Sequence, residues 1–264
     1  MVWPLTRTRP GAQVAATMPK PVLKKSVADA VFDQLKDAIL GGALPPGEPL
    51  PAERALSTQL GVGRSAVREA LARLEQTGLV ITRHGDTTRV QDFRVHAGLD
   101  LLPSILVDAA GKPNPSVLRA CLEMRAAITP DVCRLCAQRS PHVGAELRAV
   151  VEPMRKEQDP MVLRGFNVRF WQAVVLGCQN VAYQLAYNSL RRVFDLFEAQ
   201  LAGALAQELQ NHQGFQAIAQ AITSRDGERA LEAARAHIAT GLTSSLHAVS
   251  GLTRTTESRS RPDK

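Results

Sequence analysis

The residues with the clearest chemical potential form the hexapeptide Gly63-Arg64-Ser65-Ala66-Val67-Arg68. In a helix, Arg64 and Arg68 lie one turn apart on the same face, with small residues between them. Arginine can bind the O6 and N7 atoms of guanine in a bidentate contact, and small residues let a helix backbone approach the major groove closely. This pattern therefore predicts a helix that inserts into duplex DNA.

Further polar residues flank this hexapeptide. Arg54 begins the preceding helical pattern, where it can hold a phosphate or a flanking base, and Arg83-His84-Gly85 combines donors with a glycine that can enter a minor groove. Taken singly, Arg68 and Arg73 could instead be solvated helix residues that pair with Glu69 or Glu75. The order of the elements favours DNA contact for the whole array. The candidate DNA-binding residues are Arg54, Gly63, Arg64, Ser65, Ala66, Arg68, His84 and Gly85.

The elements that must position these residues follow from apolar spacing, caps and turns. The pattern predicts helices, then two short strands joined across His84-Gly85-Asp86, with Gly61-Val62-Gly63 as the turn between the second and third helices. The expected helices are Ser26–Leu40, Ala52–Leu60 and Arg64–Gln76, and the expected strands are Val80–Thr82 and Thr88–Val90.

After Asp92 the strand signals fade and only helical spacing remains. We expect Pro130 to kink or split the first of these helices. The fold class is thus mainly α, a winged helix-turn-helix domain followed by an all-α bundle. The expected helices are Val117–Arg139, Gly144–Lys156, Val162–Gly177, Val181–Leu209, Phe215–Ser224 and Gly227–Leu246.

Length and charge agree with this division. The 264 residues allow two domains, and a net charge of +7 favours a polyanionic partner. No run of about 18 apolar residues predicts a membrane span, and residues 1–25 lack the apolar core of a secretory signal, so we expect a cytoplasmic protein. The expected parts are a disordered basic arm (1–25), the DNA-binding domain (26–93), the helical effector and dimerisation domain (94–248) and a polar tail (249–264).

The four cysteines do not form a metal or redox motif. Cys133 and Cys136 are spaced as CxxC, but they lie in an apolar helical pattern without a second pair downstream. We expect buried, reduced thiols.

The region 26–93 resembles the DNA-binding domain of the GntR superfamily of bacterial transcription regulators. The resemblance rests on PPGEPLPAERALSTQLGVGRSAVREALARLEQTGLV and on HGDTTRV in the wing. The helical remainder resembles the ligand-binding domain of the FadR-type subfamily, through LEMRAAI around Arg125, FWQAVVLGCQN ending at Asn180, and the stretch Asp226–His237.

This resemblance implies a homodimer on a pseudo-palindromic operator, with DNA contacts from the residues named above. Gly63 stands where the family usually has Ser or Thr, which removes one hydroxyl contact, and Thr87 replaces a glycine common at the wing tip. The HGxxT form resembles the branch that responds to fatty acyl-coenzyme A.

Many relatives hold a divalent metal with Asp and His at i and i+4 and two further His. The corresponding positions here are Asn167, Trp171, Phe215 and His237, so one ligand remains. His212 could substitute, but two imidazoles alone would bind a metal weakly. We therefore predict neither metal nor cofactor, and His237 is more simply a hydrogen-bonded core histidine.

The sequence leaves the identity of the effector open. Arg125 could pair with an anionic group of a ligand or only brace the bundle, and Asn180 is more typical of a helix end. Phe194 lies where acyl-coenzyme A-binding relatives carry a tyrosine. A cavity lined by aromatic residues would suit an acyl chain or an aromatic compound, with a fatty acyl-coenzyme A or an organic acid as candidates. The candidate effector contacts are Arg125, Trp171, Phe194, Phe215 and His237.

The leading hypothesis is thus a ligand-responsive transcription regulator. An architectural DNA-binding protein without an effector is the alternative. An enzyme is disfavoured, because the sequence has no nucleophile elbow, Walker loop or HExxH motif.

Overall fold

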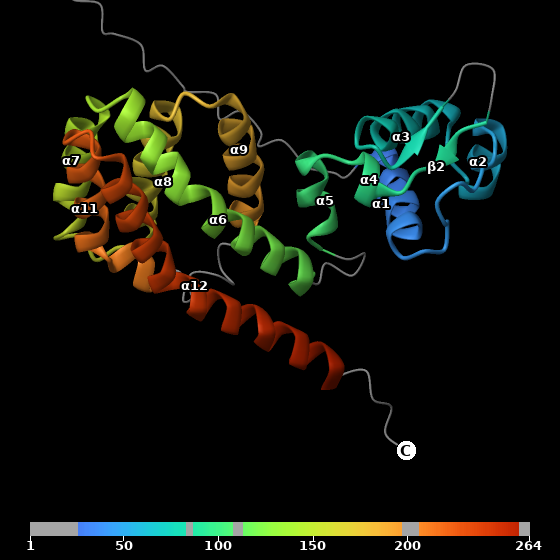
Figure 1. Cartoon of the computed structure of the whole chain (residues 1–264). Helices are drawn as coiled ribbons and strands as arrows, with labels where there is room; N and C mark the ends of the chain where they lie inside the picture. Colours follow the sequence, from blue (N-terminus) through green and yellow to red (C-terminus); the bar gives the residue numbers. More distant parts are fainter. Residues whose placement is uncertain (1–25, 83–86, 108–112, 197–205, 259–264) are drawn as a thin grey trace, which may run out of the picture.

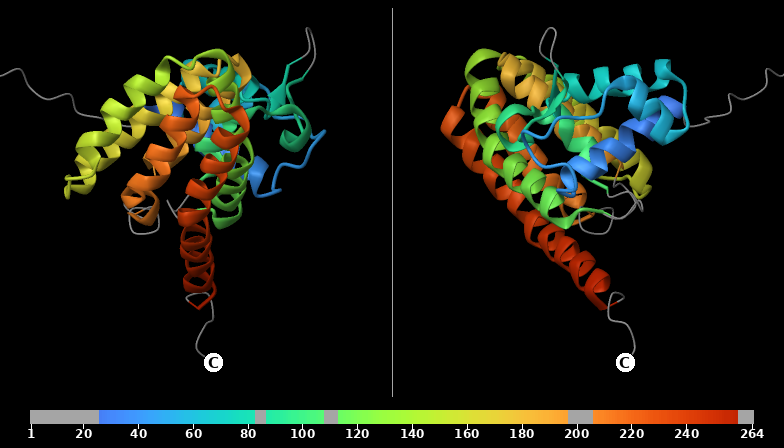
Figure 2. Two further views of the ribbon diagram at one scale, coloured as in Figure 1. Left: turned by 60° about the vertical axis from the view of Figure 1, so that its left-hand side comes forward. Right: turned by 90° about the vertical axis from the view of Figure 1, so that its right-hand side faces the viewer.

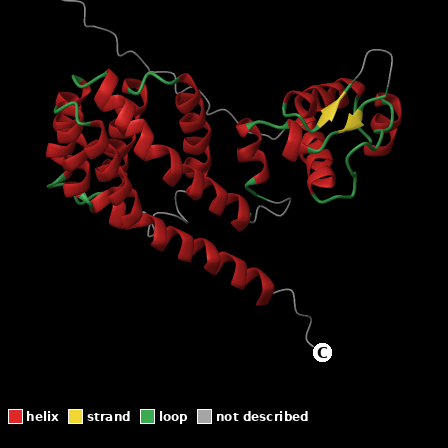
Figure 3. Ribbon diagram, viewed as in Figure 1, coloured by secondary structure: helices red, strands yellow, loops and turns green. Residues whose placement is uncertain are grey.

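The computed structural model describes residues 26–82, 87–107, 113–196 and 206–258. Helices dominate these residues, and the two short strands lie in the N-terminal part (Figure 3). Figure 1 shows a small N-terminal unit (blue to teal) and a larger helical bundle, joined through α4 and α5. The mainly α fold predicted from the sequence is confirmed.

Three helices build the N-terminal unit: α1 (Val27–Leu40), α2 (Glu53–Leu60) and α3 (Arg64–Gln76). Each buries one apolar face, and the buried side chains meet in a single cluster, as amphipathic spacing predicts. The buried members of this cluster include Val31, Phe32, Leu35, Leu50, Leu56, Leu71, Leu74 and Leu79.

Two glycines set the direction of the chain around α3. Gly61 ends α2 in the left-handed region at φ 64°, and Gly78 follows α3 at φ 72°. A β-carbon on Gly78 would also lie 2.8 Å from the carbonyl oxygen of His96, so only glycine fits there.

The strands β1 (Val80–Ile81) and β2 (Arg89–Val90) pair antiparallel, with Val80 opposite Val90. The segment 47–50 runs along the other edge of β2, where the Leu50 amide donates to the Thr88 carbonyl (2.8 Å). We call residues 80–90 the wing.

A connection of short helices, which the sequence pattern does not predict, follows the wing. It consists of α4 (Phe93–His96), a 3₁₀ turn (Leu99–Leu101) and α5 (Leu102–Ile105). Leu101 packs in the N-terminal cluster and Leu106 packs with the bundle, so the connection contacts both halves.

The bundle contains six long helices among the described residues. Its main core buries Phe170, Trp171, Phe215, Leu147 and Met154 together. A helical stretch at 206–210 precedes α11, and residues 197–205, which the sequence assigns to one helix over Val181–Leu209, lie outside the described residues. The long helices are α6 (Pro115–Arg139), α7 (Val143–Met154), α8 (Pro160–Gly177), α9 (Val181–Leu196), α11 (His212–Thr223) and α12 (Gly227–Ser258).

The expectation that Pro130 would split its helix is wrong, since α6 is continuous from Pro115 to Arg139. Pro130 has no amide hydrogen to donate to the carbonyl one turn earlier. The Thr129 hydroxyl donates to the Arg125 carbonyl (2.7 Å), and Pro130 is itself buried in the bundle. Tertiary packing therefore holds the helix together across the missing bond.

The last helix is longer than the expected Gly227–Leu246. Helix α12 continues to Ser258, and both views of Figure 2 show its C-terminal part projecting beyond the bundle. Val249 is buried against Leu118 and Leu122, so apolar contact with α6 continues past the expected end. None of the helices in the described ranges has the length and apolarity needed to cross a bilayer.

Candidate functional site

The N-terminal end of helix α3 exposes arginines and residues with small side chains to solvent. Gly63 caps the helix without a side chain, and Arg64, Ser65 and Arg68 are exposed. Ala66 is half-buried, and Val67 behind it is fully buried. The two arginines predicted to bind DNA therefore lie on the open side of the helix.

Arg68 is held in place by α2. Its Nε and Nη2 atoms donate to the two carboxylate oxygens of Glu53 at 3.3 and 3.0 Å. This hydrogen bond and the positive charge of Arg68 lower the pKa of Glu53. The arginine side chain remains 72% exposed, so the ion pair orients it without covering it. Arg54, next to Glu53, is exposed at the start of α2.

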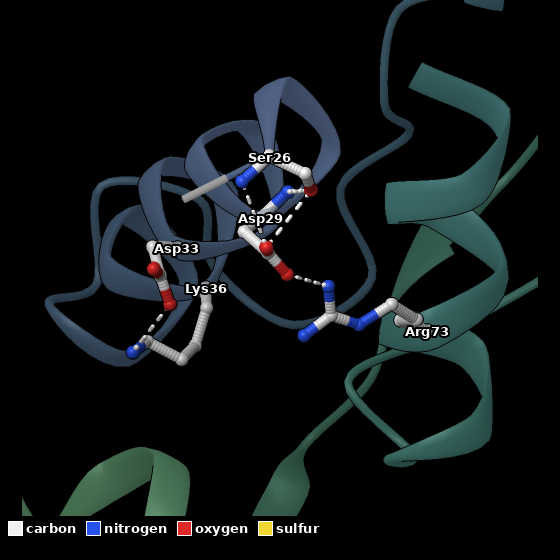
Figure 4. A network of polar contacts seen from close by, with 5 residues as sticks. All are labelled: Ser26, Asp29, Asp33, Lys36 and Arg73. Atoms are coloured by element: carbon white, nitrogen blue, oxygen red, sulfur yellow. Dashed lines mark hydrogen bonds and ion pairs between the residues drawn. The ribbon is translucent and has the colours of Figure 1, made fainter. Parts of the chain in front are cut away.

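Arg73 has a different role from Arg64 and Arg68. Its Nη1 donates to Asp29 Oδ1 at 2.5 Å, and its guanidinium lies 4.3 Å from the centre of the Phe32 ring. Figure 4 shows Asp29 joining this arginine to Ser26, whose amide and hydroxyl both donate to Oδ2. The sequence offers Glu69 and Glu75 as partners within the same helix. In the structure Arg68 pairs instead with Glu53 of α2, and Arg73 pairs with Asp29 of α1.

The base of the wing is tied to α3. The Thr82 amide donates to Glu75 Oε1 (2.9 Å), and the Thr82 and Thr88 hydroxyls lie 3.0 Å apart across the two strands. The predicted contacts His84 and Gly85 at the wing tip lie outside the described residues.

The bundle contains a partly open cavity of about 930 Å³, which is large enough for a drug-sized or lipid-like molecule. Of the five candidate effector contacts, Arg125, Trp171 and Phe194 line it. Most of its other lining residues are apolar: Ile128, Val132, Leu163, Val168, Val175 and Leu190 are among them.

Arg125 is paired within the protein. Its two terminal nitrogens donate to the two carboxylate oxygens of Glu208, with Nη1 at 2.9 Å from Oε2. Glu208 is almost fully buried and also lines the cavity. Sequence analysis missed this acid, because its partner is 83 residues away and no local pattern connects the two positions.

Phe215 and His237 lie behind the cavity lining. The ring centres of Phe215 and His237 are 4.2 Å apart, and Trp171 lies 5.9 Å from His237. Burial lowers the pKa of His237 to about 4, so the imidazole is neutral near pH 7. His237 Nε2 is 3.8 Å from Glu208 Oε1, and neither ring nitrogen is hydrogen-bonded, so the expected hydrogen-bonded core histidine is buried but lacks the bond.

The four candidate metal positions do not assemble a ligand set. Trp171 and Phe215 fill the core as aromatic rings next to His237, and the Asn167 Oδ1 atom is buried without a hydrogen-bond partner. Within the described residues, no group of three or more His, Cys, Asp or Glu side chains could hold an ion.

The cysteines are free and buried, as expected. Burial raises the pKa of the Cys136 thiol to about 12 and that of Cys121 to about 11, which makes both poor nucleophiles. Asn180 accepts the Ala182 amide at 3.0 Å at the start of α9, which confirms it as a helix-end residue.

Comparison with known proteins finds two family models that match separate parts of the chain. Residues 27–90 match the family model "Bacterial regulatory proteins, gntR family", and residues 120–240 match "FCD domain". The chain is 40% identical to the HTH-type transcriptional regulator Mce2R of Mycobacterium tuberculosis, over 82% of this chain and 90% of that protein. It is 29% identical to the fatty acid metabolism regulator protein of Edwardsiella ictaluri, over 64% of this chain and 70% of that one.

Among solved structures, a GntR family regulator from Pseudomonas syringae is similar at 18% identity and a TM-score of 0.44, covering 87% of this chain and 89% of that one. The matched families and curated relatives are transcription regulators and not enzymes. The chain therefore belongs to the GntR family and is a DNA-binding transcriptional regulator with a C-terminal FCD domain.

Proposed function

We propose that two copies of this protein bind a pseudo-palindromic operator in the cytoplasm, and that a small molecule in the bundle cavity changes their affinity for it. The observation that carries this proposal is the exposure of the first turns of α3. Arg64, Ser65 and Arg68 are exposed there, while Val67, Leu71 and Leu74 are buried in the core and anchor the helix. A rigid scaffold thus supports an open basic edge.

In this proposal Arg64 and Arg68 bind guanine edges in the major groove, and Gly63, Ser65 and Ala66 let the helix approach the bases. Arg54 holds a phosphate beside them. His84 and Gly85 contact the minor groove, an assignment that rests on the family resemblance alone.

The dimer follows from the size of the element. One recognition helix contacts about half of an operator, and two-fold related half-sites then lie about 10 base pairs apart or at a multiple of that spacing.

The effector site is the cavity between α6, α8 and α9. Its mostly apolar lining, with Trp171 and Phe194, suits an acyl chain or an aromatic compound. Such a ligand alters operator affinity only if it binds the DNA-competent and DNA-incompetent arrangements of the dimer with different affinities. The name of the fatty acid metabolism regulators among the relatives is consistent with an acyl chain.

Selection of bound duplexes from a randomised DNA pool tests the first part of the proposal. We expect an enriched inverted repeat, bound by two protomers in analytical ultracentrifugation and protected at both half-sites in footprinting. Binding without any enriched sequence, with strong salt dependence, would instead identify an architectural DNA-binding protein.

A further inference from the structure

The Arg125–Glu208 ion pair determines the electrostatic character of the cavity. The arginine side chain is 17% exposed and the glutamate side chain 3%, so the pair is shielded from bulk water. Burial alone would lower the pKa of Arg125, but the charge and hydrogen bonds of Glu208 outweigh it and raise the pKa. Arg125 is therefore charged, and Glu208 occupies both of its terminal guanidinium nitrogens in a bidentate contact.

The other arginines of the cavity have acidic partners too. Arg164 donates to Asp195 Oδ1 at 2.6 Å, and Arg191 lies 3.6 Å from Asp195 Oδ2. All five of these charged residues line the cavity. A ligand carboxylate that enters the described part of this cavity meets two fixed carboxylates, each already bound to an arginine.

We propose that Glu208 acts as an internal carboxylate that occupies Arg125, so that the cavity selects uncharged apolar molecules over apolar carboxylates. Glu208 is then a specificity-determining residue. This inference rests on the proposed effector site and assigns its ligand class.

The selection has a direct physical cause. To take the same bidentate position on Arg125, a ligand carboxylate must displace Glu208, which would then lose these hydrogen bonds and its counter-ion. An uncharged molecule with the same chain contacts the apolar lining and leaves the ion pair intact. Only the carboxylate therefore loses binding free energy through the displacement of Glu208.

Two brominated probes of equal chain length, 12-bromododecan-1-ol and 12-bromododecanoate, test this selection at pH 7.5. Bromine quenches tryptophan fluorescence at short range, and Trp171 lines the cavity. The protein contains two tryptophans, so the experiment uses the full chain with Trp3→Phe, in which Trp171 is the only one. We expect the alcohol to quench Trp171 at a concentration about tenfold or more below that of the acid, the size of one charge-assisted hydrogen bond.

Glu208→Gln is the decisive variant, because it keeps the side-chain shape and leaves the charge of Arg125 uncompensated. We expect it to reduce or remove the preference for the alcohol, with carboxylate binding gained about tenfold and alcohol binding little changed. In the double variant Arg125→Met with Glu208→Met both charges are gone, and the preference for the alcohol should persist. This variant also covers the case in which Glu208→Gln does not fold, since removal of a whole buried pair is tolerated better than removal of one partner.

Equal quenching by both probes in the parent protein would overturn the proposal and leave the effector cavity standing. An unchanged preference in Glu208→Gln, or a preference for the acid in the double variant, would overturn it as well. Quenching by neither probe would contradict the apolar effector site itself, and with it the ligand class assigned here.

Discussion

Asp29 in the first turn of α1 and Arg73 near the end of α3 are joined by a hydrogen-bonded ion pair of 2.5 Å. This contact joins α3 to α1, and the Arg73 guanidinium also lies over the Phe32 ring. The three arginines of α3 therefore lie in two different environments. Arg64 and Arg68 face solvent at the N-terminal end, while Arg73 holds the fold.

Arg64→Ala and Arg73→Ala should separate these roles, because both remove one positive charge. We expect Arg64→Ala to weaken binding to the selected operator by about tenfold to a hundredfold and to leave thermal stability unchanged. Arg73→Ala should lower the melting temperature and change operator affinity far less. Fluorescence anisotropy and thermal melts measure the two effects, and equal loss of affinity in both variants would contradict the assignment.

Glu53→Gln should reduce sequence discrimination. The substitution removes the carboxylate that holds Arg68 and also removes a negative charge from the surface that we propose faces DNA. We expect tighter binding to a scrambled duplex and weaker discrimination between it and the operator. Competition titrations at two salt concentrations provide the measurement, and Glu69→Gln, which changes an exposed acid next to Arg68 in α3, is the matched control. Identical specificity ratios in the two variants would argue against a positioning role for Glu53.

Because of the Asp29 ion pair, the free energy of unfolding should depend on pH in the acidic range. The hydrogen bond from Arg73, followed by those from Ser26, lowers the pKa of Asp29 from 3.8 to about 2 in the folded protein. Because the folded-state pKa is depressed, the contribution of this carboxylate is complete above about pH 5 and is lost as the pH falls from about 4 towards 2.

The urea midpoints of the parent protein and Asp29→Asn should therefore differ at pH 7 and converge as the pH falls towards about 2. A difference that stayed constant over this range would show that the carboxylate charge is not what stabilises the contact.

Gly144→Ala should destabilise the bundle. A β-carbon at this position in α7 would overlap the Thr223 hydroxyl and lie 2.8 Å from the Thr223 backbone nitrogen, so α7 and α11 would have to move apart. We expect a loss of about 1–3 kcal/mol, as for other overpacked cores.

Gly165→Ala is the matched control for this prediction. Gly165 is exposed in α8, and no atom lies within 4 Å of the position that a β-carbon would take, so alanine should stabilise the helix by about 1 kcal/mol or less. Chemical denaturation of both variants tests the pair, and similar effects at the two sites would contradict the close approach of α7 and α11.

Sequence periodicity predicted most elements of this fold correctly. Helix α3 has the expected bounds, and α1 and α2 begin one residue inside theirs. The reason is local: apolar spacing, the Ser26 cap and Gly61 each act within a few residues. A split at Pro130, one of the two outcomes expected there, does not occur, and α12 extends beyond its predicted end, because packing of α6 against α12 outweighs local preferences.

The sequence alone likewise predicted that Arg64 and Arg68 lie one turn apart at the start of α3, because both fall within its first two turns. Only the tertiary structure decided which acids hold which arginines. Glu53 lies 15 residues before Arg68, Asp29 lies 44 before Arg73, and Glu208 lies 83 after Arg125. Such pairs depend on how the helices pack against one another, and the spacing of residues along the sequence does not reveal that packing.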